Sequence, residues 1–315
     1  MLGCLLAPRP SLAEVTIYSQ LLVPLDGSRF GEAALPLALR LSHLTGARIH
    51  LVTVQELLPA AAPAEWQNAT QESARAYLED VAEGVREASG GEVTTSFRVG
   101  HVVDELLEEA WDADLVVMAT HGWGMISRAW LGSVADAFSR NVPRPVLMMR
   151  PETDGGDDAL GPGVEWSISK MLLPLDGTPL SEAIIDHATE LGSLFGASYH
   201  LVRVVPLPKE FSSSYLPDMI RFNKEYLQES EKVSNEYLEA QARRLRAKGF
   251  EVDATVLVGA QPVHGILSEA EASESDLIAV SAHHRAGLTR ALLGSTSDKV
   301  LRGSPVPVLL YRHAE

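Results

Sequence analysis

Cysteine is almost absent from this chain of 315 residues, in which Cys4 is the single example. One cysteine cannot form a disulfide within the chain, and low cysteine content is typical of reducing compartments. No stretch approaches the ~18 consecutive apolar residues that a membrane-spanning helix requires. The segment from Met1 to Ala13 lacks a basic region ahead of its apolar residues, so it does not resemble a secretory signal peptide. We therefore expect a cytoplasmic protein that does not interact with a membrane.

Basic residues are also in deficit, with 26 Lys and Arg against 42 Asp and Glu and a formal net charge of −16. Proteins that bind the nucleic-acid backbone usually carry a basic face, so nucleic acid is not an expected partner. A phosphate ligand is still compatible with this charge, because backbone N–H groups and helix N-termini can bind phosphate without Lys or Arg. Hydrophobic residues make up 46% of the chain and charged residues 22%, as in globular proteins with a substantial core.

Several catalytic motifs are missing as well. The sequence contains no Gly-x-x-x-x-Gly-Lys-Ser/Thr phosphate-binding loop and no Gly-x-Ser-x-Gly nucleophile motif. Gly122-x-Gly124 does not continue into a dinucleotide fingerprint, because residue 127 is serine. Ser133 has no evident base partner in the sequence. We therefore assign no catalytic residue, and a metal site stays undetermined.

The chain instead contains an internal duplication. A Leu-Asp-Gly motif occurs at Asp26 and again at Asp176, and a Leu-Gly-Ser motif occurs at Gly132 and again at Gly294. The offsets are 150 (176 − 26) and 162 (294 − 132). A repeat of this size is a whole domain, since solenoid repeats have periods of roughly 20–50 residues. We predict two domains, at 17–150 and 167–312, joined by a Gly- and Asp-rich linker at 151–166.

Both copies show the same alternation of apolar runs and helical periodicity. The predicted strands are 19–25, 48–54, 92–99, 115–119 and 144–149, then 169–175, 199–205, 251–258, 277–281 and 305–311. The predicted helices are 29–44, 68–88, 102–111 and one from Gly132, then 180–194, 218–248, 263–272 and one from Gly294. Apolar strands that alternate with helices indicate a parallel sheet covered on both faces. The predicted fold is α/β, with two doubly wound, Rossmann-like domains that bind ligands beyond the carboxyl ends of their strands.

In the first copy, a glycine-containing loop follows the fourth predicted strand. Ala119, Thr120, His121 and Gly122 leave this strand, and after nine residues Gly132-Ser133 opens a helix. Glycine permits close backbone approach to a ligand, and a helix N-terminus favours an anion. These two elements could form a phosphate cradle, or they could be a tight turn that needs glycine for steric reasons. Within this loop, His121 could approach a phosphate or point to solvent.

Asp26 ends the first predicted strand and should face the same crevice. As a ligand residue, it could bind a ribose hydroxyl or a divalent metal that arrives with phosphates. As a structural residue, it would cap the following turn, a common role of aspartate. Asp176 repeats the motif in the second copy, and the repetition fits either role.

Three motifs together resemble the universal stress protein family. They are Leu-Val-Pro-Leu-Asp-Gly-Ser, Met-Ala-Thr-His-Gly and Leu-Gly-Ser-Val-Ala, in this order and spacing. The resemblance covers nearly all of both copies and implies adenine nucleotide alpha hydrolase-like domains that bind ATP, with Mg²⁺ as an accompanying metal. The positions that it implies for nucleotide binding in the first copy are Asp26, Val54, Gly100, Ala119, Thr120, His121, Gly122, Gly132, Ser133 and Val134. The corresponding positions in the second copy are Asp176, Val204, Gly259, Gly294 and Ser295.

The second copy departs from the family's Gly-x-x-Gly pattern. Ser281 replaces the first glycine and His284 the second, whereas the first copy has only the mild change to Ala119. A side chain at position 284 would stand where backbone should meet phosphate, so we expect weak or absent nucleotide binding in the second domain. The alternative is that His284 and Arg285 contact the phosphates with their side chains.

The resemblance implies an ATP-binding regulator of the stress response, with the nucleotide held mainly by the first domain. We expect the domains to pair edge to edge through Val146–Met149 and Val308–Tyr311, because these strands are apolar and flanked by proline. A homodimer of whole chains and a signalling protein as partner are further expectations. The alternatives are a slow ATP hydrolase and a nucleotide-free scaffold for protein interactions.

Overall fold

The computed structural model describes residues 18–59, 62–89, 91–120, 131–150, 166–207, 217–282 and 295–312. The strands of the first half are β1 (Gln20–Leu25), β2 (Arg48–Gln55), β3 (Val93–Val99), β4 (Leu115–Ala119) and β5 (Val146–Met149). Its helices are α1 (Arg29–Glu32), α2 (Leu35–Thr45), α3 (Ala64–Ser89), α4 (Val102–Ala110) and α5 (Ser133–Ser139). The second half contains β6 (Lys170–Pro174), β7 (Ser198–Val205), β8 (Val252–Val258), β9 (Leu277–Ala282) and β10 (Val308–Arg312). Its helices are α6 (Pro179–Glu182), α7 (Ile184–Phe195), α8 (Pro217–Ala247), α9 (Pro262–Ala272) and α10 (Ser295–Gly303).

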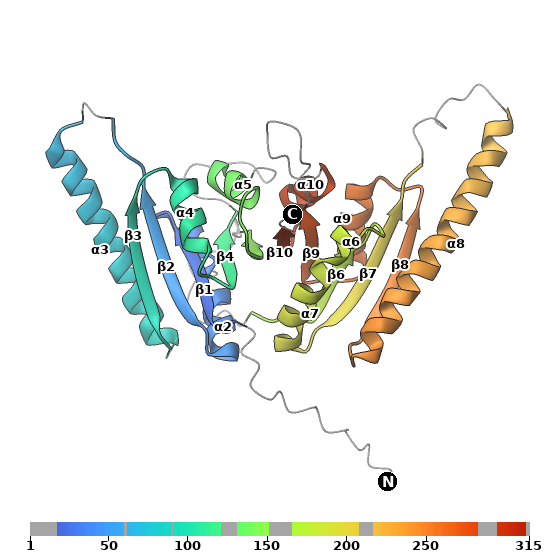
Figure 1. Cartoon of the computed structure of the whole chain (residues 1–315), viewed down its shortest axis with the longest axis horizontal. Coiled ribbons are helices and arrows are strands. Elements are labelled where there is room, and N and C mark those ends of the chain that lie inside the picture. Colours follow the sequence, from blue (N-terminus) through green and yellow to red (C-terminus); the bar gives the residue numbers. More distant parts are fainter. Residues whose placement is uncertain are drawn as a thin grey trace, which may run out of the picture.

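All these strands belong to one 10-stranded sheet in the order β3-β2-β1-β4-β5-β10-β9-β6-β7-β8 (Figure 1). Within each half, neighbouring strands are parallel, and the long helices α3 and α8 lie at the two ends of the molecule (Figure 1). The predicted α/β fold with doubly wound domains is confirmed. In each half the chain order reverses beside the first strand, between β1 and β4 and between β6 and β9.

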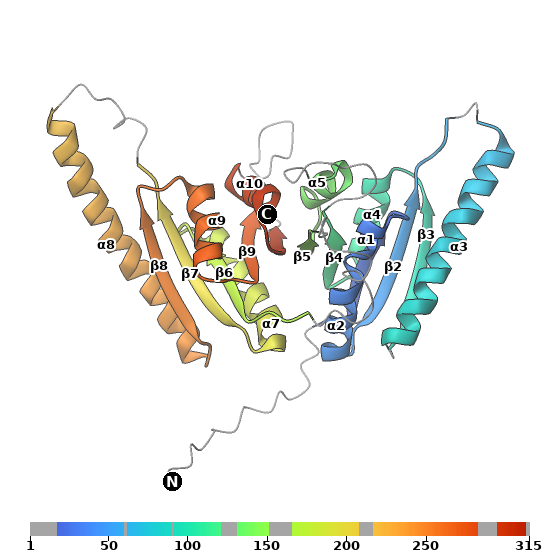
Figure 2. The ribbon, with the colours of Figure 1, turned by 180° about the vertical axis from the view of Figure 1, so that it is seen from behind.

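The two halves join through β5 and β10, the one antiparallel pair among the described strands. Val308 lies opposite Met148, Leu309 opposite Leu147 and Leu310 opposite Val146. The predicted edge-to-edge pairing of the last strands is therefore confirmed. Figure 2 shows from behind that α5 and α10 also lie side by side at this junction.

A hydrophobic core runs along each face of the sheet and through both halves. Helices α2, α3, α7 and α8 pack on one face, where the core includes Leu147 and Leu309. Helices α4, α5, α9 and α10 pack on the other, where it includes Val146 and Val308. Burial on both faces explains why β4 and β5 are apolar throughout and β9 is apolar except for Ser281. Because each core crosses the junction, the halves share their apolar packing.

The prediction of one continuous helix over 29–44 is wrong, because the chain forms α1 and then α2. Pro36 has no N–H group, so it cannot continue the hydrogen-bond ladder across the break. The same break separates α6 from α7 at Ala183, where the sequence has no equivalent proline. In each half, the short helix carries a glutamate that accepts a hydrogen bond from a tyrosine of the long helix. The Oη–Oε1 distances are 3.0 Å for Tyr77–Glu32 and 2.8 Å for Tyr237–Glu182.

Candidate functional site

A cavity of about 350 Å³ opens at the carboxyl ends of β1 and β4, where the strand order reverses. This is the location at which doubly wound sheets bind their ligands. Seven of the predicted site residues line it: Asp26, Val54, Ala119, Thr120, Gly132, Ser133 and Val134. They come from four separate segments of the chain. His121 and Gly122 lie outside the described residues.

Asp26 has the structural role that its sequence position allowed, and it also lines the cavity. Its Oδ1 accepts hydrogen bonds from the backbone N–H of Ser28 at 3.0 Å and from the Ser28 hydroxyl at 2.6 Å. The turn between them uses Gly27 at a φ of 79°, a value that favours glycine. The carboxylate thus caps the turn and is also part of the cavity wall. These hydrogen bonds fix the orientation of the Asp26 carboxylate in the cavity wall.

Gly31 is a cavity residue that the sequence analysis missed. A Cβ at this position would lie 2.5 Å from Asp26 Oδ1, closer than real contacts allow. Only glycine therefore leaves the capped Asp26 carboxylate undisturbed. The sequence carries no motif for this role, since the requirement arises from the approach of α1 to the end of β1.

The start of α5 supplies backbone N–H groups to the same cavity. The N–H of Gly132 donates to Thr120 O at 2.9 Å, which fixes the beginning of α5 beside the end of β4. The N-cap residue of this helix, Gly132, has no side chain that could cap it. The first N–H groups of a helix lack partners within the helix, so those of Ser133 and Val134 are suited to an anion. Because α5 has only seven residues, these local groups matter more than a helix dipole.

The remaining wall of the cavity is apolar. It is formed by Pro24 and Leu25 of β1, Met118 of β4, Val102 and Leu106 of α4, and Ala135 of α5. Val102 and Leu106 are four residues apart and therefore lie on one face of their helix. This spacing was the available sequence signal for them. An apolar wall facing a few convergent polar groups is the usual arrangement of a small-molecule site.

Two predicted glycines lie apart from the residues that line the cavities. Gly100 donates its N–H to Gln55 O at 3.0 Å, and a Cβ there would meet the Glu105 carboxylate. Gly259 donates in the same way to Val205 O at 2.8 Å. Both glycines therefore connect the ends of two outer strands. The structure does not bring them to the cavity walls.

A second cavity, of about 280 Å³, occupies the equivalent place in the other half. Asp176 and Val204, two of the predicted site residues, line it, whereas Gly294 lies outside the described residues. Ser295 begins α10. Asp176 repeats the geometry of Asp26, since its Oδ1 accepts from the N–H and the hydroxyl of Thr178 at 2.9 and 2.6 Å. The carboxylate and its capped turn are thus common to both halves.

Hydroxyl side chains replace small or apolar residues at four positions of the second cavity. The pairs are Gly31 and Ser181, Ala119 and Ser281, Val134 and Thr296, and Ala135 and Ser297. The Ser297 hydroxyl donates to Ser281 O at 2.7 Å. Among the described residues, the Ser281 hydroxyl is buried without a hydrogen-bond partner. The second cavity therefore has the same framework and a different chemical lining.

Within the described ranges, no group of three or more His, Cys, Asp or Glu side chains is placed to hold a metal ion. No helix in the same part of the chain has the length and hydropathy needed to cross a membrane.

Comparison with known proteins identifies the family. The sequence profile of the universal stress protein family matches residues 18–150 and again 167–312. The chain therefore belongs to the universal stress protein family, as a tandem member with two such domains. A universal stress protein of Mycolicibacterium smegmatis is 28% identical over 302 residues, with 93% of this chain and 96% of that protein covered. Another, from Mycobacterium tuberculosis, is 27% identical over 308 residues, with the same shares covered.

Solved structures agree on the fold. The crystal structure of a universal stress protein from Archaeoglobus fulgidus matches with a TM-score of 0.72 and 19% identity, covering 94% of this chain and 99% of that chain. A universal stress protein structure from Pseudomonas aeruginosa matches with a TM-score of 0.65 and 20% identity, covering 94% of each chain. At such identities, the likeness supports the two-domain architecture alone.

Proposed function

We propose that the first cavity binds an adenine nucleotide, ATP, and that the chain is a nucleotide-binding regulator of the stress response. The observation that carries this proposal is the convergence of a carboxylate, uncapped N–H groups and an apolar wall at the strand-order reversal. A volume of about 350 Å³ lies within the range of small-molecule sites. Membership of the universal stress protein family supports the choice of a nucleotide.

The residues of the cavity fit the parts of ATP. The apolar wall from α4 and β4, beside Val54 of β2, suits the adenine ring. The Asp26 carboxylate is an acceptor for ribose hydroxyls. The backbone N–H groups of Ser133 and Val134, together with the Ser133 hydroxyl, are donors for phosphate oxygens. Mg²⁺ would arrive with the phosphates, and Asp26 is the one carboxylate among the described residues that line the cavity.

We propose that the second cavity binds the nucleotide weakly or not at all. It is smaller, at about 280 Å³, and hydroxyl groups occupy positions where the first cavity is small or apolar. An adenine base that covered these hydroxyl groups would exclude the water that can hydrogen-bond to them, and this desolvation reduces the binding free energy. The expected stoichiometry is one nucleotide per chain.

The matched variants Asp26→Ala and Asp176→Ala test this proposal. Both remove the same capping interaction, so both should lose about 1 kcal/mol of folding stability. Only Asp26→Ala should weaken ATP binding, by about tenfold or more, because a hydrogen bond to a charged group is lost in the first cavity alone. Isothermal titration of the full chain with ATP and Mg²⁺ gives both affinity and stoichiometry. Equal affinities in the two variants would contradict the assignment of the site.

Two measurements separate the regulator from its alternatives. Steady turnover of ATP with Mg²⁺ by the purified chain would indicate a slow hydrolase. Absence of any bound nucleotide, by mass spectrometry of the denatured protein and by titration, would indicate a nucleotide-free scaffold. The homodimer and a signalling partner stay predictions, and light scattering after size exclusion tests the first. The boundaries 17–150, 151–166 and 167–312 remain our proposed division of the chain.

A further inference from the structure

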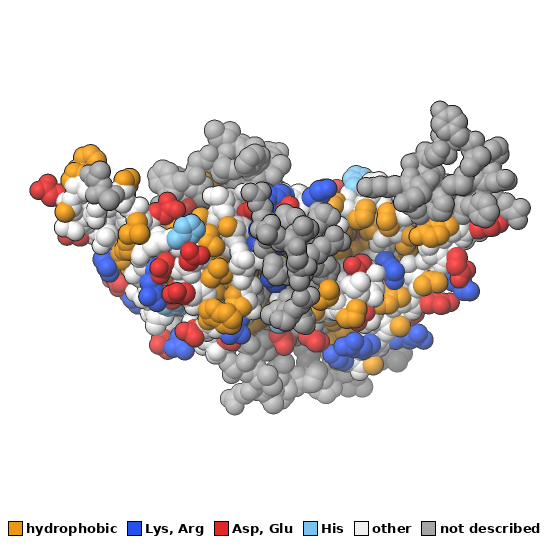
Figure 3. Space-filling model, turned by 45° about the horizontal axis from the view of Figure 1, so that its top comes forward, with side chains coloured by type: hydrophobic (Ala, Val, Ile, Leu, Met, Phe, Trp, Pro, Cys, Tyr) orange, Lys and Arg blue, Asp and Glu red, His pale blue; other side chains and the backbone are white. Residues whose placement is uncertain are grey.

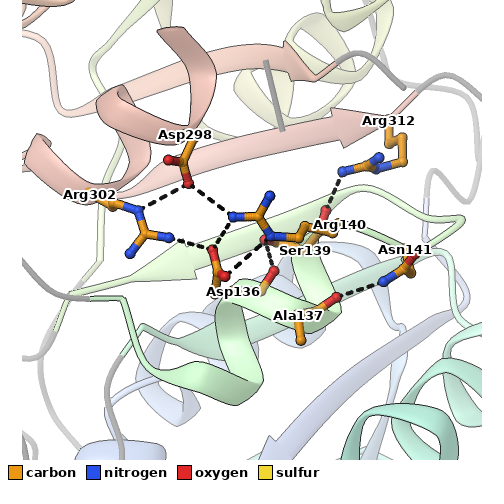
Figure 4. Close-up of polar contacts among 8 residues, drawn as sticks. All are labelled: Asp136, Ala137, Ser139, Arg140, Asn141, Asp298, Arg302 and Arg312. Carbon is orange, nitrogen blue, oxygen red and sulfur yellow. Dashed lines mark hydrogen bonds and ion pairs between the residues drawn. The ribbon is translucent and has the colours of Figure 1, made fainter. Parts of the chain in front are cut away.

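A ring of alternating charges joins α5 to α10 at the junction of the domains (Figure 4). Arg140, the residue after α5, forms an ion pair with Asp136 of α5 at an N–O distance of 2.9 Å, and within α10, Arg302 pairs with Asp298 at 3.0 Å. Arg302 also reaches Asp136 across the junction, and Arg140 lies 3.8 Å from Asp298. Two carboxylates thus face two guanidinium groups. The formal charges of these four described side chains cancel one another.

Two more arginines cross the same junction in opposite directions. Arg150, which follows β5, donates from its Nη2 to Arg302 O at 2.7 Å. Arg312, the last residue of β10, donates from its Nη2 to Ser139 O at 3.0 Å. Both acceptors are neutral carbonyl groups. Arginine accumulates here although the chain as a whole has a net charge of −16, and basic side chains are visible near the middle of the molecule in Figure 3.

The guanidinium group of Arg312 is buried and makes few hydrogen bonds. Only 7% of the residue is exposed, and its Nε and Nη1 groups are buried with no hydrogen-bond partner among the described residues. Burial, followed by repulsion from Arg140, lowers the pKa of Arg312 to about 10, which still leaves it charged at neutral pH. A buried guanidinium with two unused N–H donors is costly, and buried charges in proteins are normally paired.

We propose that the junction of the two domains binds a small oxyanion of the phosphate class, held by the unused N–H groups of Arg312 on the side of Arg140. Nη2 has two N–H groups, of which one donates to Ser139 O. The other lies beside the unused N–H of Nε or of Nη1, and this pair matches the spacing of two phosphate oxygens. In Figure 4, the Arg312 side chain extends from β10 toward Arg140. The site uses residues of both domains and none of the residues that line the two cavities. It therefore does not depend on the proposed nucleotide site.

Thermal unfolding of the full chain with inorganic phosphate tests this proposal. Relative to sodium chloride at the same ionic strength, saturating phosphate should raise the Tm of the parent protein by about 2–4 °C, because a ligand of the folded state stabilises it. In Arg312→Met, this rise should vanish, and phosphate affinity in a titration should fall by about tenfold or more. Arg312→Lys keeps the charge without the fork and should retain part of the response.

Two further variants serve as controls. Arg150→Met makes the same chemical change at the corresponding position of the first domain, and it should keep most of the phosphate response. Asp26→Ala, altered in the first cavity, should keep all of it, so the result does not depend on nucleotide binding. Without phosphate, Arg312→Met should be at least as stable as the parent, since it removes a buried unpaired charge. The proposal is overturned if phosphate acts no differently from chloride, if Arg312→Met responds like the parent, or if Arg150→Met loses the response equally.

Discussion

At the scale of the residue, the two otherwise similar cavities differ at position 31 and its counterpart 181, which are glycine and serine. Gly31 leaves the Asp26 carboxylate free of steric contact from α1. Ser181 instead accepts a hydrogen bond from the Asp176 N–H at 3.2 Å through its own hydroxyl. One helix position therefore makes the first cavity roomier and the second more polar. This difference supports a division of roles between the domains.

The substitution Gly31→Ala should weaken ATP binding in the full chain by about tenfold. The added Cβ would come within 2.5 Å of Asp26 Oδ1 and displace a carboxylate anchored by two hydrogen bonds. Stability should change by less than about 1 kcal/mol, since alanine is favourable in a helix and offsets part of the strain. Titration calorimetry and chemical denaturation measure the two effects. Ser181→Ala is the matched control, and the proposed role of Gly31 fails if both variants bind ATP like the parent.

The sequence predicted the polar and glycine-rich parts of the candidate site better than its apolar wall. Asp26 and Ser133 belong to short motifs, so their meeting at one cavity followed from strand order. Gly31 has no motif, because its importance comes from an approach in space between α1 and β1. Gly100 is the opposite case: it follows a strand as expected, but it lies near Gln55 and Glu105 and is not among the residues that line the cavity.

At the scale of the element, Asp114 connects the two strands that carry the first cavity. Its Oδ2 accepts from the Ser19 N–H at 2.7 Å, the Ser19 hydroxyl at 2.6 Å and the Gln20 N–H at 3.0 Å. The second domain repeats this arrangement with Asp276, which accepts from Ser169 and Lys170. These carboxylates hold the start of β1 beside β4, and of β6 beside β9.

Replacement of Asp114 by asparagine should reduce stability in a pH-dependent way. Burial acts to raise the pKa of Asp114, but hydrogen bonds from Ser19 and Gln20 outweigh it and hold the pKa below its ordinary value of 3.8. A lowered folded-state pKa gives stability that is present above the unfolded pKa and is lost as the pH falls through the folded value. We expect Asp114→Asn to cost about 1–2 kcal/mol at pH 7. The cost should shrink below about pH 4, as protonation removes the charge in the parent too.

Urea unfolding of the parent and Asp114→Asn at pH 7, 5 and 3 measures this cost. A difference in unfolding free energy that stays constant over these pH values would show that the ionised carboxylate is not the stabilising group.

Element order and type followed from apolar runs and helical periodicity, because both faces of the sheet are buried and impose that pattern. The break between α1 and α2 could not be predicted from this pattern, since the apolar spacing continues across it. The tyrosine–glutamate contacts of Tyr77 with Glu32 and Tyr237 with Glu182 fix the short helices from outside. Such contacts join residues 45 and 55 positions apart and leave no local sequence signal.

At the scale of the whole molecule, the shared sheet and the two shared cores predict that both domains unfold together. Both hydrophobic cores run through the two halves, so apolar packing holds the halves together. On the face drawn in Figure 3, acidic and basic side chains are interspersed, and exposed ion pairs of this kind contribute little to stability. Leu147 and Leu309 are fully buried and opposite each other in the β5–β10 pair. They belong to the core that runs through both halves.

Truncation at the junction, Leu147→Ala, should therefore lower the stability of the entire molecule. A buried leucine replaced by alanine typically costs about 2–5 kcal/mol, through lost burial and a residual cavity. Calorimetry should show one transition in the parent and one transition, at lower temperature, in the variant. A variant with two transitions, of which one keeps the parental Tm, would show that the domains unfold independently.

The antiparallel β5–β10 pair also has a consequence for how the molecule behaves at low concentration. Two separate single-domain chains that met through such strands would dissociate on dilution, because their association depends on protomer concentration. Here the two domains belong to one chain, so their effective concentration is fixed, and the β5–β10 pairing persists when the protein is dilute. The tether also frees the two halves from identical sequence, which allows one to diverge in ligand preference while the other is retained.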